Sequence, residues 1–294
     1  MDNFKEKLIR MIFTVLAFAS LFFLLGIVFV LFKESVPIIS EINIFKFLFG
    51  SQWYPTHEPA EFGILSLMAA SLWVTAGAMF VCVPLGIGTA LYINEIASLR
   101  QKHFLKPLIE ILAGIPSIVY GFFGMLIVAP LVQKIFNIPT GLCALSASIV
   151  LGIMAIPTIA SISEDALSFV PKSFKEASYA LGANRWQTLV KVTIPAAASG
   201  ISTSVILGIS RIVGETMTVL MVSGGAAVMP KSFFDPVRPM TSTIAAEMGE
   251  AAVGSIHYHS LFAIGLILFL ITLVFNAVAE IISRKYRIKL GLDR

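Results

Sequence analysis

The amino-acid sequence predicts an all-α membrane protein that crosses the bilayer six times. Its 294 residues are 57% hydrophobic and only 13% charged, whereas about 25% of the residues of a typical soluble protein are charged. The apolar residues also gather into six runs, each long enough for a spanning helix, which needs about 20 mostly apolar residues. The predicted spans are residues 8–32, 64–93, 107–132, 140–162, 196–223 and 261–283.

The first run follows a basic start and contains Ala17-Phe18-Ala19, which resembles a signal-peptide cleavage site. The apolar stretch continues through Phe32, however, and the apolar core of a signal peptide has only about 7–15 residues. We therefore expect an uncleaved anchor helix. The predicted organisation is an N-terminal anchor (1–33), an outer loop (34–63), a transmembrane domain (64–283) that includes an inner loop (163–195), and a tail (284–294).

The distribution of Lys and Arg predicts the topology. Most of the 21 basic residues lie before the first run, between the second and third, between the fourth and fifth, or after the sixth. Because cytoplasmic loops are enriched in Lys and Arg, this alternation places both termini in the cytoplasm. It also accounts for the net charge of +4, so nucleic acid is not expected as a partner.

The two long connectors could be docking surfaces or simple linkers. Outside, residues 241–253 have the pattern of an amphipathic or re-entrant helix, and the loop around them could contact a donor protein. Inside, residues 176–181 and 184–192 have helical patterns separated by Gly182, a residue type that often ends helices. A helix, a turn and a second helix form a suitable docking element, but an ordinary connector remains the alternative.

The inner loop also contains a specific motif. Glu176-Ala177-Ser178 is followed by Gly182 and, nine residues later, by Val192-Thr193-Ile194-Pro195. This pattern resembles the EAA motif of ABC-importer permeases, with conservative departures at Ser178, Val192 and Ile194. The resemblance implies that residues 176–192 are coupling helices that sit in a groove on an ATPase. The residues expected to carry this coupling are Glu176, Ala177, Gly182, Val192, Ile194 and Pro195.

The resemblance extends over nearly the whole chain to the permeases of Pst-type phosphate importers. Residues 48–55, 62–65, 113–121 and 211–217 support it, and residues 241–245 and 254–258 favour the C-type subunit. It implies a type I ABC importer permease core in a prokaryotic cytoplasmic membrane. It further implies a second homologous permease, a dimeric cytoplasmic ATPase that uses the ATP, and an external phosphate-binding protein. This chain itself is expected to bind no cofactor.

Charged residues inside the fifth run are candidates for the translocation pathway. Arg211 is predicted near the middle of the membrane, where an arginine costs roughly 2.5–3.5 kcal/mol on insertion scales and is usually functional. Glu215, four positions later, is expected on the same helix face as a counter-ion. Thr216 is the hydroxyl expected to join them, among several in this run. The alternative is a purely structural ion pair between helices.

Three prolines interrupt the predicted spans. Pro84, Pro116 and Pro157 lie in the second, third and fourth runs, and proline kinks or breaks a helix. The sequence around Pro116 predicts a kinked third helix. Discontinuous helices often line transport sites, although packing alone could also explain a kink.

Several other patterns are interpreted as structural. Cys82 and Cys143 lie inside apolar runs and are expected as small core residues. Residues 225–232 approach the phosphate-loop pattern, but Pro230 occupies its second glycine position. His257 and His259 have no third ligand at a suitable spacing, so no metal site is predicted. The chain is therefore not expected to be an ATPase.

The predicted mechanism is alternating access driven by the ATPase. Two relatives of this hypothesis stay open: a permease for another oxyanion, such as sulfate or molybdate, and a passive anion channel. A membrane-embedded enzyme is less consistent with the sequence, because the spans contain no recognisable catalytic motif.

Overall fold

The structure, a computed structural model, describes residues 2–289 and contains six helical segments long and apolar enough to cross a membrane. The predicted fold class is therefore confirmed. These segments are Glu6–Ile38, Leu65–Ile96, Ser117–Phe136, Ala144–Ser168, Arg185–Val213 and Ile256–Val278.

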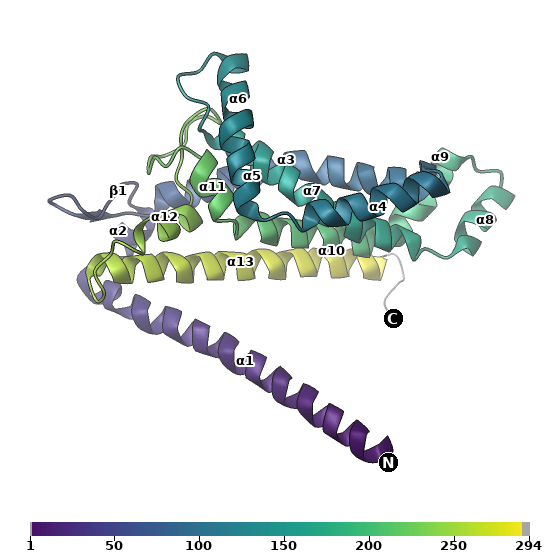
Figure 1. Ribbon diagram of the computed structural model, residues 1–294, viewed down its shortest axis with the longest axis horizontal. Helices are drawn as coiled ribbons and strands as arrows, with labels where there is room; N and C mark the ends of the chain where they lie inside the picture. The colour runs from purple at the N-terminus through teal and green to yellow at the C-terminus, as the bar shows by residue number, and fades with distance from the viewer. Residues whose placement is uncertain (1, 290–294) are drawn as a thin grey trace.

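The helices and strands follow one another in this order, with the short π-helical turns labelled η (Figure 1). They are α1 (Asp2–Glu41), α2 (Ile44–Phe49), β1 (Trp53–Tyr54), β2 (Glu61–Phe62), α3 (Leu65–Leu91), η1 (Tyr92–Ile96), α4 (Leu99–Ala113), α5 (Ser117–Phe123), η2 (Gly124–Val128), α6 (Ala129–Phe136), α7 (Ala144–Ser168), α8 (Lys172–Ala180), α9 (Arg185–Thr188), η3 (Leu189–Thr193), α10 (Ile194–Val213), α11 (Met217–Val222), α12 (Met240–Glu247) and α13 (Ile256–Lys289).

The helix α7 lies at the centre of the bundle, between α3 and α10. Small residues allow these helices to approach closely, as is usual between helices in membranes. A Cβ atom added to Gly86 of α3 would lie 2.8 Å from the Ile159 side chain of α7, and one added to Gly152 would lie 2.8 Å from Val81. Cys82 and Cys143 are fully buried and free in this core, which confirms their predicted role.

Two predicted spans are not continuous helices. The third, expected over residues 107–132, is broken at 114–116 between α4 and α5, and Figure 1 shows α5 and α6 turning away from the direction of α4. The fifth, expected over 196–223, is broken at 214–216 between α10 and α11. Pro84 and Pro157, by contrast, lie inside the uninterrupted helices α3 and α7.

The bundle has two distinct ends (Figure 1). The N-terminal end of α1, the C-terminal end of α13 and the α8–α9 pair lie toward one end, whereas the β1–β2 hairpin, α2 and α12 lie toward the other. The predicted helix at residues 241–253 is shorter than expected, because α12 ends at Glu247 and the chain then turns. The arrangement groups the connectors into two separate surfaces.

Candidate translocation site and docking element

The two helix breaks lie against each other. The hydroxyl of Thr218, at the start of α11, donates a hydrogen bond to the main-chain carbonyl of Ser117, at the start of α5, across 2.9 Å. The guanidinium Nη2 of Arg211, in the last turn of α10, donates to the carbonyl of Ala113, at the end of α4, across 3.3 Å. Four helix ends therefore meet at one point, as in the discontinuous helices that line transport sites.

Local sequence explains both breaks. Pro116 lies immediately before α5 with an extended ψ of 140°, and it has no N–H with which to continue α4. Gly114 and Gly214 follow the last residues of α4 and α10, and glycine is a poor helix residue that is common at helix ends. Kinks at Pro116 were predicted from the sequence, but the break after Gly214 was not.

Arg211 connects three helices at this junction. In addition to Ala113 of α4, its guanidinium contacts α7, because Nη1 donates to the Thr158 hydroxyl across 3.1 Å. Both acceptors are neutral, and no carboxylate among residues 2–289 forms an ion pair with this side chain. Since a guanidinium has five N–H donors, its charge and several donors remain available to an anion.

The predicted ion pair between Arg211 and Glu215 is wrong. Glu215 does not continue the face of α10, because that helix ends at Val213. Its carboxylate instead accepts a hydrogen bond from the main-chain N–H of Thr218 across 3.1 Å, and its carbonyl accepts one from the Thr241 hydroxyl across 2.8 Å. Glu215 therefore caps the start of α11 rather than neutralising Arg211.

The remaining polar groups of this region hold the broken helix in place. Thr216 lies in the break, and its hydroxyl donates to the Gly214 carbonyl across 3.3 Å. Ser210 donates to Asn276 of α13 across 2.7 Å. Thr158 and Thr241 were missed by the sequence analysis. The only sequence cue for Thr158 is a hydroxyl next to Pro157 in an apolar run.

A second polar region, the α8–α9 element, lies at the other end of α10. Gly182 separates the two helices with a φ of +83°, which a residue with a Cβ atom adopts at a cost. Asn184 and Gln187 form a reciprocal capping box at the start of α9. The hydroxyls of Ser178 and Thr188 are 2.9 Å apart in the buried contact between the helices. The predicted helix–turn–helix is therefore confirmed.

This element presents apolar side chains outward. Leu181 is 89% exposed and Trp186 is 71% exposed, at a turn where a soluble protein would normally carry polar residues. A groove of about 560 Å³ runs beside them. Among the residues expected to carry coupling, Ala177, Gly182 and Val192 line this groove, Glu176 is exposed on α8, and Ile194 and Pro195 begin α10.

Ion pairs attach the α8–α9 element and its neighbours to the bundle. Lys175 of α8 pairs with Glu95 of η1 across 2.5 Å. Lys106 of α4 pairs with Glu164 and Asp165 near the end of α7, across 2.7 and 2.9 Å. Hydrogen bonds to Asp165 and Glu164 raise the pKa of the Lys106 ammonium above its usual value. Displacement of α8 is therefore transmitted directly to the end of α3.

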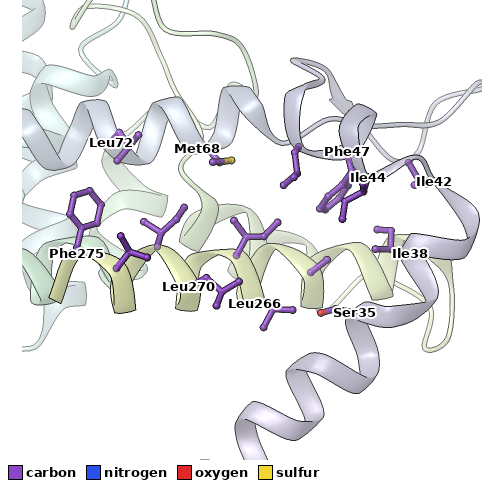
Figure 2. Close-up of a pocket in the computed structure, with 15 residues that line it drawn as sticks. Ser35, Ile38, Ile42, Ile44, Phe47, Met68, Leu72, Leu266, Leu270 and Phe275 are labelled. Carbon is purple, nitrogen blue, oxygen red and sulfur yellow. The ribbon is translucent and has the colours of Figure 1, made fainter. Parts of the chain in front are cut away.

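A large cavity elsewhere is unsuited to a polar solute. It has a volume of about 630 Å³ and lies where α1 diverges from α13, beside α2 and α3 (Figure 2). Its walls are hydrocarbon side chains such as Ile38, Phe47 and Phe275. Ser35 is the only hydroxyl in the lining, and it donates to the Leu31 carbonyl. The junction of the helix breaks remains the better candidate for a translocation site.

Together, a bundle of spanning helices, two adjoining helix breaks with an unneutralised arginine, and an exposed apolar docking element define a subunit of a membrane transporter. Residues 82–288 match the family described as binding-protein-dependent transport system inner membrane component. This match covers more than half of the chain, and the chain belongs to that family.

Individual relatives agree with this assignment. The chain is 38% identical over 251 residues to a probable ABC transporter permease, YqgH, of Bacillus subtilis, covering 85% of this chain and 81% of the relative. It is 35% identical to the phosphate transport system permease PstC of Mesorhizobium japonicum, covering 87% and 83%. It is 32% identical to a probable PstC of Methanocaldococcus jannaschii, covering 96% of each chain.

Solved structures agree on the fold. An inward-facing MetNI methionine ABC transporter matches with a TM-score of 0.56 at 20% identity, covering 79% of this chain and 99% of that chain. A bacterial transporter of alginate matches with a TM-score of 0.57 at 14% identity, covering 75% and 79%. The fold is thus that of ABC transporter permeases.

Proposed function

We propose that this chain is the pathway-forming permease subunit of an ATP-driven importer of inorganic phosphate. The observation that carries the proposal is Arg211, whose guanidinium lies at the meeting point of two helix breaks without a carboxylate partner. The planar guanidinium fork suits phosphate oxygens. Relatives named as phosphate permeases over 83% and 96% of their own length support phosphate as the solute.

The pathway residues are Arg211, Glu215 and Thr216. Arg211 attracts the anion, and Thr216 offers a hydroxyl from the break itself. Glu215 holds the start of α11 through Thr218 and sets the position of the break. An anion that binds Arg211 more tightly in one arrangement of the four helix ends shifts the equilibrium toward that arrangement.

The energy comes from partners. The α8–α9 element docks in a dimeric cytoplasmic ATPase that uses the ATP, a second homologous permease completes the pathway, and an external phosphate-binding protein delivers the solute. This chain binds no cofactor of its own. The exposed Leu181 and Trp186 supply the apolar anchor for the ATPase contact, and Lys175 transmits its movement to α3 through Glu95.

The topology is part of the proposal. Both termini and the α8–α9 element lie in the cytoplasm, and the hairpin β1–β2 and α12 lie outside. The grouping of the N-terminal end of α1, the C-terminal end of α13 and α8–α9 at one end of the bundle supports this orientation (Figure 1). So does the positive-inside distribution of Lys and Arg.

The test is transport by the reconstituted complex. Proteoliposomes that contain both permeases and the ATPase should accumulate labelled phosphate only with internal-facing ATP and external binding protein. Excess unlabelled phosphate should compete, and sulfate and molybdate should not. Competition by sulfate or molybdate alone would identify the other oxyanion as the solute. Uptake that persists without the ATPase would show a passive anion channel instead.

A further inference from the structure

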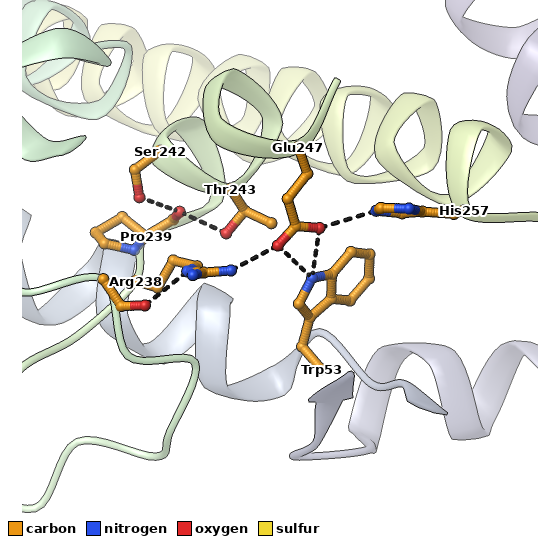
Figure 3. Close-up of polar contacts among 8 residues, drawn as sticks. Trp53, Arg238, Pro239, Ser242, Thr243, Glu247 and His257 are labelled. Carbon is orange, nitrogen blue, oxygen red and sulfur yellow. Dashed lines mark hydrogen bonds and ion pairs between the residues drawn. The ribbon is translucent and has the colours of Figure 1, made fainter. Parts of the chain in front are cut away.

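The outer end of α12 is held by one carboxylate that four segments share. Glu247, the last residue of α12, accepts hydrogen bonds from the Trp53 indole of β1 across 3.0 and 3.2 Å (Figure 3). It also pairs with Arg238, in the loop before α12, across 2.5 Å and with His257, at the start of α13, across 2.9 Å. We call Trp53, Arg238, Glu247 and His257 the outer hub.

The hub is well ordered by burial. The Trp53 side chain is 2% exposed and packs edge-on against Phe62 of β2. The Glu247 side chain is only 13% exposed, so its charge is stabilised chiefly by Arg238 and the indole N–H. The Arg238 Nε also donates to the Gly225 carbonyl across 2.7 Å, which adds the 223–239 loop to the hub.

The other end of α12 touches the translocation site. The Thr241 hydroxyl donates to the main-chain carbonyl of Glu215, inside the break between α10 and α11, across 2.8 Å. The main-chain N–H of Met240 donates to the Ser71 hydroxyl of α3 across 2.9 Å. An eight-residue helix is about 12 Å long. Thus α12 spans the distance between the outer hub and the helix break.

We infer that α12 is a rigid link through which the outer hub sets the geometry of the helix break, with Glu247 and Thr241 as positioning residues. A shift of the hub that moves the end of α12 also moves the carbonyl of Glu215 at its other end. The carboxylate of Glu215 caps α11, so the link reaches the start of that half-helix. This inference rests on the proposed function only for its consequence in transport.

An open cavity beside the hub gives a partner access to it. The cavity has a volume of about 560 Å³, and Tyr54, Ala226 and Glu250 line it together with the hub residues. A side chain inserted there reaches Arg238 and Glu247 directly. The hub is therefore a place where contact with an external protein converts into movement of α12.

The first test uses matched substitutions on α12 in the assembled complex. Thr241→Val and Thr243→Val each remove one buried hydroxyl, but the Thr243 hydroxyl donates only to Pro239, at the start of the same helix. Thr241→Val should lower the maximal rate of phosphate uptake at least fivefold without changing the half-saturating concentration of binding protein, and Thr243→Val should change it less than twofold. Equal effects of the two variants would overturn the link.

Glu247→Gln tests the other end of the helix. Glutamine keeps the size of the side chain and can still accept the Trp53 hydrogen bond, but it loses the ion pair with Arg238. The double variant Glu247→Gln/Thr241→Val should be no slower than the slower single variant, because both changes act through one element. Effects that multiply would show that the two residues act independently and would contradict the inference.

A chemical probe separates this inference from the proposed function. Cys82 and Cys143 are fully buried, so Thr216→Cys places one accessible thiol in the break. Its rate of reaction with a soluble maleimide should change at least threefold in the Glu247→Gln background and remain unchanged in the Thr243→Val background. If no variant transports phosphate but this rate still changes, the proposed function fails and the link stands. An unchanged rate overturns the link.

Discussion

The guanidinium of Arg211 and the main-chain carbonyl of Ala113 are joined by a hydrogen bond of 3.3 Å between the ends of two broken helices. A carbonyl at a helix C-terminus carries partial negative charge and is a natural partner for a cation. An entering anion competes with this carbonyl and with the Thr158 hydroxyl for the same donors. The pair therefore ties occupancy of the site to the relative position of α4 and α10.

Substitution of Arg211 tests its role in the pathway. Arg211→Ala should reduce ATP-dependent phosphate uptake at least tenfold, because it removes the only cation at the break. Arg211→Lys should keep part of the activity, since lysine keeps the charge but not the planar fork. Uptake by proteoliposomes is the measurement, and co-purification with the ATPase controls for assembly. Wild-type uptake by an assembled Arg211→Ala complex would contradict the pathway role.

The bond between Thr218 and Ser117 should stabilise the junction of α11 and α5. Thr218 is fully buried, and its hydroxyl is the donor. Thr218→Val should lower the free energy of unfolding by roughly 0.5–1.5 kcal/mol, the usual net value of one such bond. Thr218→Ser, which keeps the hydroxyl, is the control. Thermal unfolding in detergent micelles measures the difference, and equal stability of the two variants would contradict the prediction.

Gly182 should be required for the shape of the α8–α9 element. A residue with a Cβ atom at its φ of +83° costs roughly 1–2 kcal/mol. Gly182→Val should therefore weaken co-purification with the ATPase severalfold, while Gly182→Asn should retain most of it because asparagine tolerates this conformation. Gly88→Ala is the control, because a Cβ atom there meets nothing within 4 Å.

The ion pair between Lys175 and Glu95 should couple the docking element to α3. Lys175→Glu and Glu95→Lys each place like charges together and should reduce phosphate uptake more than ATP hydrolysis. The exchanged pair, Lys175→Glu with Glu95→Lys, should recover a substantial part of the loss. The number of phosphate ions transported per ATP is the quantity to measure. No recovery in the exchanged pair would show that each residue acts through other contacts.

The proposed topology can be tested by labelling single cysteines in intact cells. Both native cysteines are buried, so an introduced thiol is read against a low background. Val253→Cys, 86% exposed beyond α12, should react with a membrane-impermeant maleimide. Lys172→Cys, exposed at the start of α8, should react only after the membrane is made permeable. The reverse pattern would place the termini outside.

Sequence reasoning predicted the elements that depend on local pattern. Long apolar runs identify spanning helices because the bilayer requires them, and Gly182 predicts the turn between α8 and α9. The error at Arg211 and Glu215 came from assuming that an apolar run is one helix. Glycine is common in membrane helices, so Gly214 alone did not reveal the end of α10.

The outer hub could not be predicted from the sequence. Trp53 and Glu247 are 194 residues apart in the chain, and neither belongs to a local motif that indicates the other. His257 was considered only as a metal ligand, whereas the structure places it against Glu247. Such contacts depend on how distant segments pack, which periodicity within one segment does not record.

The helix α1 packs against α13 and is otherwise uncovered, with none of its most apolar window buried. These are the first and last helices that the structure describes, so α1 enters the bilayer long before its partner is synthesised. At 5–20 residues per second, the translation of the intervening chain takes roughly 10–45 s. During that interval α1 must persist as a solitary lipid-solvated helix, and the closing step of assembly is its capture by the newly made α13.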